Sequence, residues 1–214
     1  LKILILSWKK ILVQNLWIMK RQEYKFSINR LDLNILKKKL KLRRKFKSRQ
    51  INSYYFDTPF LKDFIDSEEG TVPRKKLRFR WYGKKKTKIG NFEIKITEDL
   101  VRKKEKIKVE NFDLEINKIL HRFKFKYIPI IKVSYQRDYF KSNISNLDMN
   151  YDTDIIYERL GKNYQQISKV HDFTNIFEIK DNLYISPDSF LKFINHKRIR
   201  FSKYSEGVKK LNLS

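Results

Sequence analysis

An acid and a base stand two residues apart beside an aromatic residue at three places in this chain. The tetrapeptide FEIK occupies residues 92–95 and again residues 177–180, and a near copy, EYKF, occupies residues 23–26. Side chains at positions i and i+2 of a β-strand point to the same face of a sheet. Each motif therefore predicts a strand with a charged pair on one face and an apolar residue on the other.

The segment LRFR extends this pattern, because Arg78 and Arg80 share one face while Leu77 and Phe79 share the other. Solvation of the charged faces on an open sheet is the simplest interpretation. If the strands instead curl into a barrel, their charged faces meet in its lumen. A lumen lined by Lys and Arg needs an anion, and glutamates among them could bind a divalent cation through carboxylate oxygen. The pattern then predicts a site for a triphosphate bound with its metal.

A net charge of +26 also favours a polyanionic partner. The chain has 50 Lys and Arg residues against 24 Asp and Glu, an excess typical of proteins that bind nucleic acid, anionic membranes or phosphate chains. Alanine is absent while Lys, Ile and Asn abound, so AT-rich coding bias is an alternative source of part of the lysine excess. Cysteine is absent as well, which excludes disulfides and thiolate metal sites.

The expected elements make one mainly antiparallel α+β domain over residues 19–214. Strands in hairpin order predominate, and no linker rich in Gly, Ser or Pro divides them. We expect strands at residues 21–28, 50–56, 75–82, 91–96, 101–109, 128–139, 147–152, 155–157 and 176–180. Helices are expected at residues 31–46, within 60–72, at 112–123 and at 187–195, and a short extended piece at 200–203.

Residues 1–18 are expected to be an extension outside the domain. The stretch is apolar but is interrupted by Lys2, Lys9 and Lys10, so its longest apolar run is far shorter than a bilayer span. Met19 directly precedes the stretch KRQEYKF, which contains the first charged motif, and is therefore the expected start of the domain. An amphipathic anchor at a membrane surface is the alternative for this stretch.

The charged motifs occur in the order found in the VTC (vacuolar transporter chaperone) polyphosphate polymerase domain, and the chain resembles that family over residues 21–211. The matching stretches are RQEYKF, SYYFDTP, RKKLRFRWYG, NFEIK, KVSYQRDYF, MNYDTDI, IFEIK and FSKYSEG. The family belongs to the triphosphate tunnel metalloenzymes, which include the CYTH enzymes. CYTH triphosphatases and cyclases open with ExExK, whereas Arg21 stands two residues before Glu23 here, so the first strand resembles the VTC type. The resemblance implies an antiparallel β-barrel that forms a triphosphate tunnel with a few flanking helices.

The resemblance also implies roles for individual residues. Catalytic contacts with phosphate oxygens would come from Lys25, Arg78, Arg80, Lys95 and Arg137. Further substrate-binding residues would be Lys104, Lys106, Lys180, Ser202 and Lys203, although RKKEKIK leaves the register of the lysines at 103, 104 and 106 open. Mn²⁺ or Mg²⁺ would be bound by Glu178, with Glu23 and Asp152 as further candidates.

The implied activity is a metal-dependent polyphosphate polymerase that transfers the terminal phosphoryl group of ATP to a growing polyphosphate chain. A tunnel triphosphatase and a non-catalytic polyphosphate-binding module remain alternatives. Trp81 and Tyr82 beside basic residues would suit a nucleic-acid surface, but no nucleic-acid motif is present, so no specific nucleic-acid partner is expected. We expect a cytoplasmic monomer, with a membrane-protein partner and a place at the inner face of a membrane left open.

Overall fold

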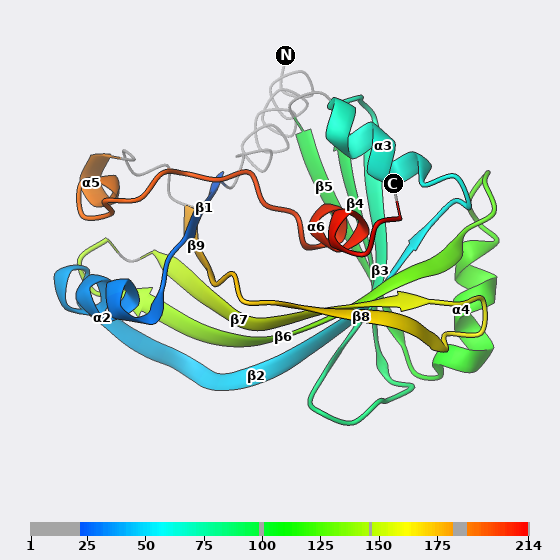
Figure 1. Ribbon diagram of the computed structural model, residues 1–214, viewed down its shortest axis with the longest axis horizontal. Coiled ribbons are helices and arrows are strands. Elements are labelled where there is room, and N and C mark those ends of the chain that lie inside the picture. The colour runs from blue at the N-terminus through cyan, green and yellow to red at the C-terminus, as the bar shows by residue number, and fades with distance from the viewer. Residues whose placement is uncertain (1–21, 99–100, 146, 182–187, 214) are drawn as a thin grey trace, which may run out of the picture.

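A computed structural model describes residues 22–98, 101–145, 147–181 and 188–213, in which one curled antiparallel sheet carries the whole fold (Figure 1). The strand order is β1-β9-β7-β6-β2-β3-β4-β5, with β8 paired to β7 beside this path. The strands are β1 (Gln22–Ser27), β2 (Leu42–Asp57), β3 (Arg74–Tyr82), β4 (Gly90–Glu98), β5 (Val101–Val109), β6 (Ile128–Ser142), β7 (Asp148–Leu160), β8 (Gln166–Asp172) and β9 (Ile176–Asp181). The helices are α2 (Arg30–Lys39), α3 (Lys62–Glu69), α4 (Phe112–Leu120), α5 (Asp188–Leu191) and α6 (Lys203–Lys210).

The sheet is a half-barrel whose concave face is covered by the end of the chain. Within the described ranges, no pairing joins the edge strands β1 and β5. After α5 the chain runs along β1, where the Ile199 amide donates to the Lys25 carbonyl at 2.9 Å. It then forms α6, which lies over the concave side (Figure 1). The α+β fold class expected from the sequence is therefore confirmed.

Apolar side chains occupy the convex face, and helices cover it at both ends. Leu33 and Leu36 of α2 pack with the apolar residues of β1 and β9, such as Tyr24 and Ile179. At the other end, α4 packs with Leu77, Phe79 and Trp81 of β3 and with Phe92 and Ile94 of β4. The alternating apolar positions of the charged motifs thus form the core that the sequence predicts.

A third apolar cluster lies on the concave face beneath α6. Tyr204 and Val208 of that helix pack with Ile131 of β6 and Tyr157 of β7. These apolar contacts hold α6 on the sheet and leave the charged residues beside it, so the concave face has an apolar part and a charged part.

Several expected elements differ in the structure. The helix expected over residues 31–46 ends at Lys39, because Lys41 has a positive φ of 45° and the following residues pair with β6 from Leu42 onward. One strand, β7, replaces the two expected between residues 147 and 157. It continues through Asp154, whose φ is 52°, next to a register shift against β6.

Two elements were not expected from the sequence, β8 and α6. The strand β8 is mostly exposed and pairs only with β7 among the described strands, so it lacks a buried apolar face. The helix α6 begins at Lys203, the last residue of the extended piece expected at residues 200–203. Its apolar spacing at Tyr204, Val208 and Leu211 is a helical pattern that was overlooked.

The expected extension at residues 1–18 lies outside the described residues, so the structure does not test it. Among the described helices, none combines the length and the apolar character needed to cross a bilayer.

Gly207 determines how closely α6 packs on the sheet. An added Cβ would lie 2.5 Å from Ile131 Cδ1 and 2.7 Å from Tyr157 Cδ1. We expect Gly207→Ala to lower the free energy of unfolding by about 1–3 kcal/mol, because overpacking outweighs the roughly 1 kcal/mol of helix propensity gained. Urea denaturation measures the change, with Lys118→Ala on the exposed side of α4 as the control. A variant as stable as the wild type would contradict this close packing.

Candidate functional site

The candidate residues of β3, β4 and β5 lie on one face of the sheet, because residues paired across a ladder project to the same side. The register pairs Arg78 with Glu93 and Lys76 with Lys95 across β3 and β4. It then pairs Glu93 with Lys106 and Lys95 with Lys104 on β5. The register that the sequence left open is thereby determined for β5: Lys104 and Lys106 share the face of Glu93, and Lys103 lies on the other face.

The charged residues at the opposite side of the sheet share this face too. Lys25 of β1 pairs with Glu178 of β9, and Glu23 pairs with Lys180. Arg137 of β6 pairs with Asp152 of β7.

Contacts with α6 identify the shared face as the concave one. The Lys203 ammonium of α6 contacts Asp152, and Tyr204 stacks on Tyr55 of β2 at a centroid distance of 5.2 Å. Tyr55 is the partner of Arg78 in the ladder between β2 and β3. Sequence motifs far apart in the chain thus meet on the surface that α6 partly covers.

Glu93 is the centre of one ionic cluster. Its Oε2 accepts hydrogen bonds from Arg78 Nε at 2.7 Å and Nη2 at 2.5 Å, and its Oε1 accepts one from Lys104 Nζ at 2.9 Å. The glutamate is 3% exposed. Burial raises its pKa, but the charges of Arg78 and Arg80 outweigh burial and lower the pKa to about 2. Glu93 is therefore a fixed negative charge that orients the cations around it.

Asp152 is the centre of a second cluster. Both of its oxygens accept from Arg137, at 2.5 Å from Nε and 2.6 Å from Nη2, and Lys203 Nζ lies 2.5 Å from Oδ2. The side chain is fully buried. Although burial raises the pKa of Asp152, the Arg137 and Lys203 charges lower it overall. A bidentate arginine pair of this kind fixes both the position and the plane of the guanidinium group.

Two tyrosines accept hydrogen bonds from the arginines of the first cluster, and one of them, Tyr135, also contacts the second cluster through its ring. Arg80 Nη2 donates to Tyr135 Oη at 3.3 Å, and Arg78 Nη1 donates to Tyr55 Oη at 3.1 Å. Burial raises the pKa of Tyr55, but the Arg78 and Arg80 charges outweigh that effect and lower it. Tyr135 in turn lies under the Arg137 guanidinium, 5.3 Å from the ring centroid.

Three lysines, Lys25, Lys76 and Lys95, also lie on the concave face. Lys25 donates to the Phe201 carbonyl at 2.8 Å, and Lys76 donates to Ser202 Oγ at 2.9 Å, so both contact neutral oxygens. Repulsion by Arg78, followed by desolvation and by Lys25, lowers the pKa of Lys95 to about 7. Desolvation in the first place, and repulsion by Lys25, lower the pKa of Lys76 to about 8. An anion placed among these cations would relieve the repulsion.

The positions of Lys25 and Lys95 reflect the curvature of the sheet. Their strands, β1 and β4, stand near opposite ends of the strand order. The sheet curls so that Lys25 and Lys76, the ladder partner of Lys95, contact the adjacent residues Phe201 and Ser202, in agreement with the curvature in Figure 1. The concave face therefore has cations on both sides, and we call this cation-lined face the channel.

Glu178 lies beside the second cluster. It is 8% exposed, and Lys180 Nζ is 3.7 Å from its Oε1. Burial raises the pKa of Glu178, but the charges of Arg137, Lys25 and Lys180 lower it overall. Glu23 stands on the neighbouring strand β1, two residues before Lys25, the ladder partner of Glu178, and so lies on the same face.

Within the described ranges, no group of three or more Asp, Glu or His side chains could enclose a metal ion. Glu178 and Glu23 could supply one or two carboxylate ligands, which is how proteins commonly hold Mg²⁺ that also binds substrate phosphates. Asp152 differs from them, because Arg137 and Lys203 already engage both of its oxygens.

Ser202 and Lys203 both lie where α6 begins. Ser202 caps the helix by accepting from the Ser205 amide and also accepts from Lys76. The structure thus brings together all the candidate residues of the sequence analysis on or beside the concave face, while their roles stay predictions.

Glu93, Lys76 and Tyr55 were not among the candidates from the sequence. Glu93 is the acid of the FEIK motif and Lys76 is two residues before Arg78, so the i, i+2 pattern contained a signal for both. Tyr55 lies in the stretch SYYFDTP, and nothing in its local sequence shows that α6 and Arg78 meet there.

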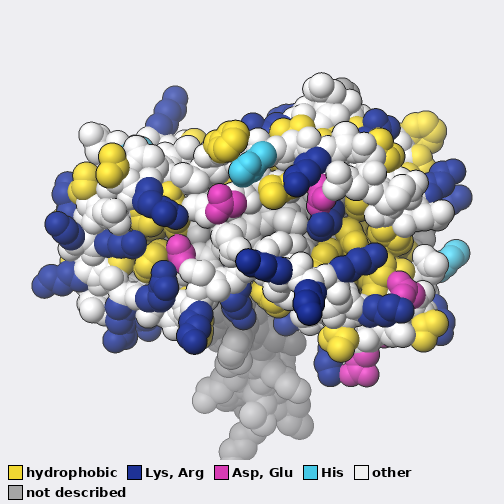
Figure 2. Space-filling model, turned by 60° about the horizontal axis from the view of Figure 1, so that its bottom comes forward, with side chains coloured by type: hydrophobic (Ala, Val, Ile, Leu, Met, Phe, Trp, Pro, Cys, Tyr) yellow, Lys and Arg dark blue, Asp and Glu magenta, His cyan; other side chains and the backbone are white. Residues whose placement is uncertain are grey.

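Lysine and arginine side chains also spread over the outside of the molecule. Figure 2 shows them on one face with few acidic side chains among them. The exposed Arg43, Arg44, Lys45 and Lys47 near the start of β2 are examples. This surface could attract polyanions, but it lacks the buried acids that orient the cations of the concave face.

Comparison with known proteins gives one family and one fold. The family model described as the VTC domain matches residues 20–126. A candidate adenylate cyclase from Vibrio parahaemolyticus has a TM-score of 0.55 at 13% identity, with 88% of this chain and 97% of that chain covered. A protein from Pyrococcus horikoshii OT3 has a TM-score of 0.57 at 14% identity, with 89% and 99% covered.

A candidate adenylyl cyclase from Hippeastrum, described as having a dominant triphosphatase activity, has a TM-score of 0.58 at 12% identity, with 89% of this chain and 96% of that chain covered. At these identities the likeness shows the fold alone. No protein of curated function matches the sequence.

Glu93→Gln tests whether this acid balances the first cluster. The substitution keeps the size of the side chain but leaves Arg78, Arg80 and Lys104 without their negative charge. We expect the free energy of unfolding near neutral pH to fall by about 2–4 kcal/mol. The folded-state pKa of about 2 is below the ordinary value of 4.5, so the contribution is complete above the ordinary pKa and is lost as pH falls through about 2.

Urea denaturation over this pH range measures the effect, and the difference between wild type and Glu93→Gln should shrink toward the acid end. Glu105→Gln is the matched control, because Glu105 is exposed on the other face of β5. A difference that stays constant between pH 5 and pH 2 would show that the charge of Glu93 does not stabilise the fold.

Proposed function

The chain belongs to the VTC domain family, and on that premise we propose that it is a polyphosphate polymerase. Its curled antiparallel sheet is the fold of CYTH-like tunnel proteins. In the proposed reaction a terminal oxygen of a phosphate chain attacks the terminal phosphorus of ATP. A new phosphorus–oxygen bond forms, the bond to the bridging oxygen breaks, and ADP leaves. The observation that carries the proposal is the concave face, where cations outnumber the acids and two buried acids orient the arginines.

Arginines and lysines have different parts in this proposal. The three arginines are oriented before substrate arrives. Glu93 binds Arg78, and Asp152 binds Arg137. Arg80 donates to the Tyr135 hydroxyl. Preorganised donors stabilise developing charge without reorganisation during the reaction. Lys25 and Lys95 add point charges from the two walls of the channel, and Lys104, Lys106 and Lys180 extend the cationic path along it.

Glu178, with Glu23 beside it, is the proposed binding site for Mn²⁺ or Mg²⁺. These two carboxylates fit an ion that completes its coordination with phosphate oxygens. When bound, the ion would withdraw charge from the transferring phosphoryl group. The proposed role of Asp152 is to position Arg137 and Lys203, because it forms direct ion pairs with both.

The proposed reaction does not require the site to remove a proton from the attacking group. The attacking oxygen of a phosphate chain is already ionised at neutral pH, so a general base is unnecessary. Lys76 and Lys95, whose pKa values are lowered to about 8 and about 7, become fully charged when a polyanion lies beside them. The protein thereby neutralises the polyanion as the polyanion binds.

A tunnel triphosphatase is the second candidate. The observation in its favour is the activity described for the Hippeastrum protein, whose fold this chain shares. Incubating the purified protein with ATP and Mn²⁺, followed by a gel stained for polyphosphate and an orthophosphate assay, separates the candidates. The polymerase forms long chains and ADP, the triphosphatase forms orthophosphate alone, and a binding module forms neither.

Arg80→Ala and Glu178→Ala should both abolish polyphosphate synthesis, for different reasons. Loss of Arg80 removes a charge-assisted contact, so binding of tripolyphosphate without metal should weaken by about 2 kcal/mol. Loss of Glu178 removes a negative charge from a cationic channel, so metal-free binding should stay equal or strengthen. Titration calorimetry with and without Mn²⁺ measures both.

Arg122→Ala, which removes an exposed charge outside the channel, is the matched control for Arg80. A Glu178→Ala protein with normal metal-dependent synthesis would contradict the metal role. An Arg80→Ala protein that binds tripolyphosphate like the wild type would contradict the phosphate role.

Binding of tripolyphosphate should take up protons near pH 8. Part of the Lys95 and Lys76 population is neutral there, and the bound anion raises both pKa values. We therefore expect the affinity to fall as pH rises from about 7 to 9, and the binding enthalpy to depend on the ionisation enthalpy of the buffer. Lys95→Met should remove most of the proton uptake, whereas Lys118→Met on α4 should not. Binding without proton uptake would place the anion away from these lysines.

A further inference from the structure

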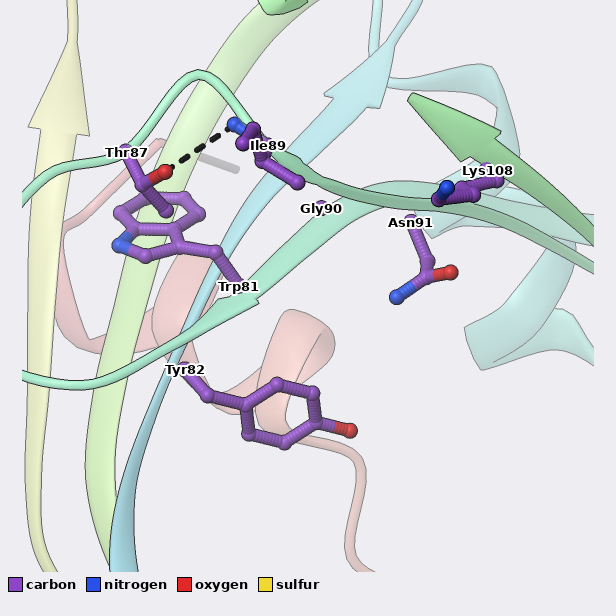
Figure 3. A pocket seen from close by; sticks show the side chains of 7 residues that line it. All are labelled: Trp81, Tyr82, Thr87, Ile89, Gly90, Asn91 and Lys108. Atoms are coloured by element: carbon purple, nitrogen blue, oxygen red, sulfur yellow. Dashed lines mark hydrogen bonds between the residues drawn. The ribbon is translucent and has the colours of Figure 1, made fainter. Parts of the chain in front are cut away.

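A cavity of about 380 Å³ lies beside the hairpin that joins β3 and β4 (Figure 3), where Asn91 pairs with Arg80 in the ladder. Resting on the proposed function, we infer that this cavity binds the adenine base of the nucleotide substrate, and that Asn91 and Tyr82 recognise it. The cavity is lined by Trp81, Tyr82, Thr87, Ile89, Gly90, Asn91 and Lys108.

The cavity continues the line of phosphate-binding residues. Asn91 pairs with Arg80 on one side and with Lys108 on the other, so its side chain projects from the same face as Glu93 and Lys95. Along β4, Asn91 is four residues from Lys95, roughly 13 Å at the rise of an antiparallel strand. A terminal phosphoryl group near Lys95 and Arg78 would then leave the ribose and base of an extended nucleotide at the level of Asn91.

Asn91 has the hydrogen-bonding groups that adenine requires. Its amide offers two donors and an acceptor, and within the described part of the chain the side chain makes no hydrogen bond. Asparagine pairs with adenine through two hydrogen bonds at once, one accepted from the exocyclic amine and one donated to a ring nitrogen. Figure 3 shows the amide and the Tyr82 ring extending into the same open space.

Tyr82 supplies a surface on which a base can stack. The residue is 43% exposed, and the Arg49 guanidinium lies 4.8 Å from the centroid of its ring. Tyr82 also lines a neighbouring cavity of about 470 Å³ together with Arg49 and Lys84. The ring therefore lies between two cavities that differ in the number of basic residues lining them.

The charges around the two cavities favour a base in the first and phosphate in the second. Among the described residues, Lys108 is the one basic residue that lines the first cavity, and its Nζ lies 2.8 Å from Glu110 Oε1 in an ion pair. The cavity is also lined by the apolar side chain of Ile89, which is 59% exposed. A phosphate chain would gain more from Arg49 and Lys84 in the neighbouring cavity, whereas a flat uncharged ring suits the first.

Binding of a non-hydrolysable ATP analogue, its GTP counterpart and tripolyphosphate tests the assignment. Asn91→Ala should weaken binding of the ATP analogue about tenfold and remove the preference over the GTP analogue, because one bidentate contact disappears. Tripolyphosphate, which has no base, should bind Asn91→Ala like the wild type. Asn117→Ala on the exposed side of α4 is the matched control.

Tyr82 provides an independent pair of variants. Tyr82→Phe keeps the stacking surface and should bind like the wild type, while Tyr82→Ala should weaken both nucleotides about tenfold, since stacking depends little on which base is bound. Equal weakening of tripolyphosphate by Tyr82→Ala would show that the ring acts through Arg49 and would overturn its stacking part.

The outcomes separate this inference from the proposed function. If Asn91→Ala binds the ATP analogue as tightly as the wild type, or loses tripolyphosphate affinity equally, the adenine site is wrong while the phosphate channel stands. If the wild-type protein binds neither tripolyphosphate nor the analogue, both the channel and the adenine site are overturned.

Discussion

Two buried carboxylates hold the arginines of the concave face, and the arrangement of the other charges depends on them. Glu93 engages Arg78 and Lys104, and Asp152 engages Arg137 and Lys203. Desolvating an ion pair is unfavourable unless its geometry and hydrogen bonding are good, and both clusters meet this condition with short, directed contacts. Removing either acid would leave several cations facing one another in the channel. The acids therefore allow a polycationic surface to exist before any anion arrives.

The end of the chain connects this electrostatic arrangement to the fold. Tyr204 and Val208 fix α6 on β6 and β7, and the same helix presents Lys203 to Asp152. Just before it, Ser202 and the Phe201 carbonyl contact Lys76 and Lys25 on the two walls. Apolar packing thus positions polar contacts that reach both margins of the curled sheet, where no strand pairing joins β1 to β5 among the described residues.

The sequence predicted the features that depend on local pattern and missed those that depend on tertiary contact. The i, i+2 spacing in FEIK and LRFR correctly predicted one charged face and one apolar face, because strand geometry alone determines it. Lys104 and Lys106 could be placed only by pairing with β4, which no local signal specifies. Residues 42–46 were expected to be helical, since long-range pairing with β6 decides their conformation. Tyr55 could not be recognised, because its contact with Arg78 depends on how α6 closes the concave face.

The most direct test of the account is a structure of the protein with tripolyphosphate and Mn²⁺. The account predicts that the phosphate chain lies along the concave face, in contact with Arg78, Arg80 and Arg137 and between Lys25 and Lys95, with the ion at Glu178. The arginines should keep their contacts with Glu93 and Asp152, since these hold them in place beforehand. A phosphate chain bound instead to the exposed outer lysines, with the concave face free of phosphate, would contradict the central claim.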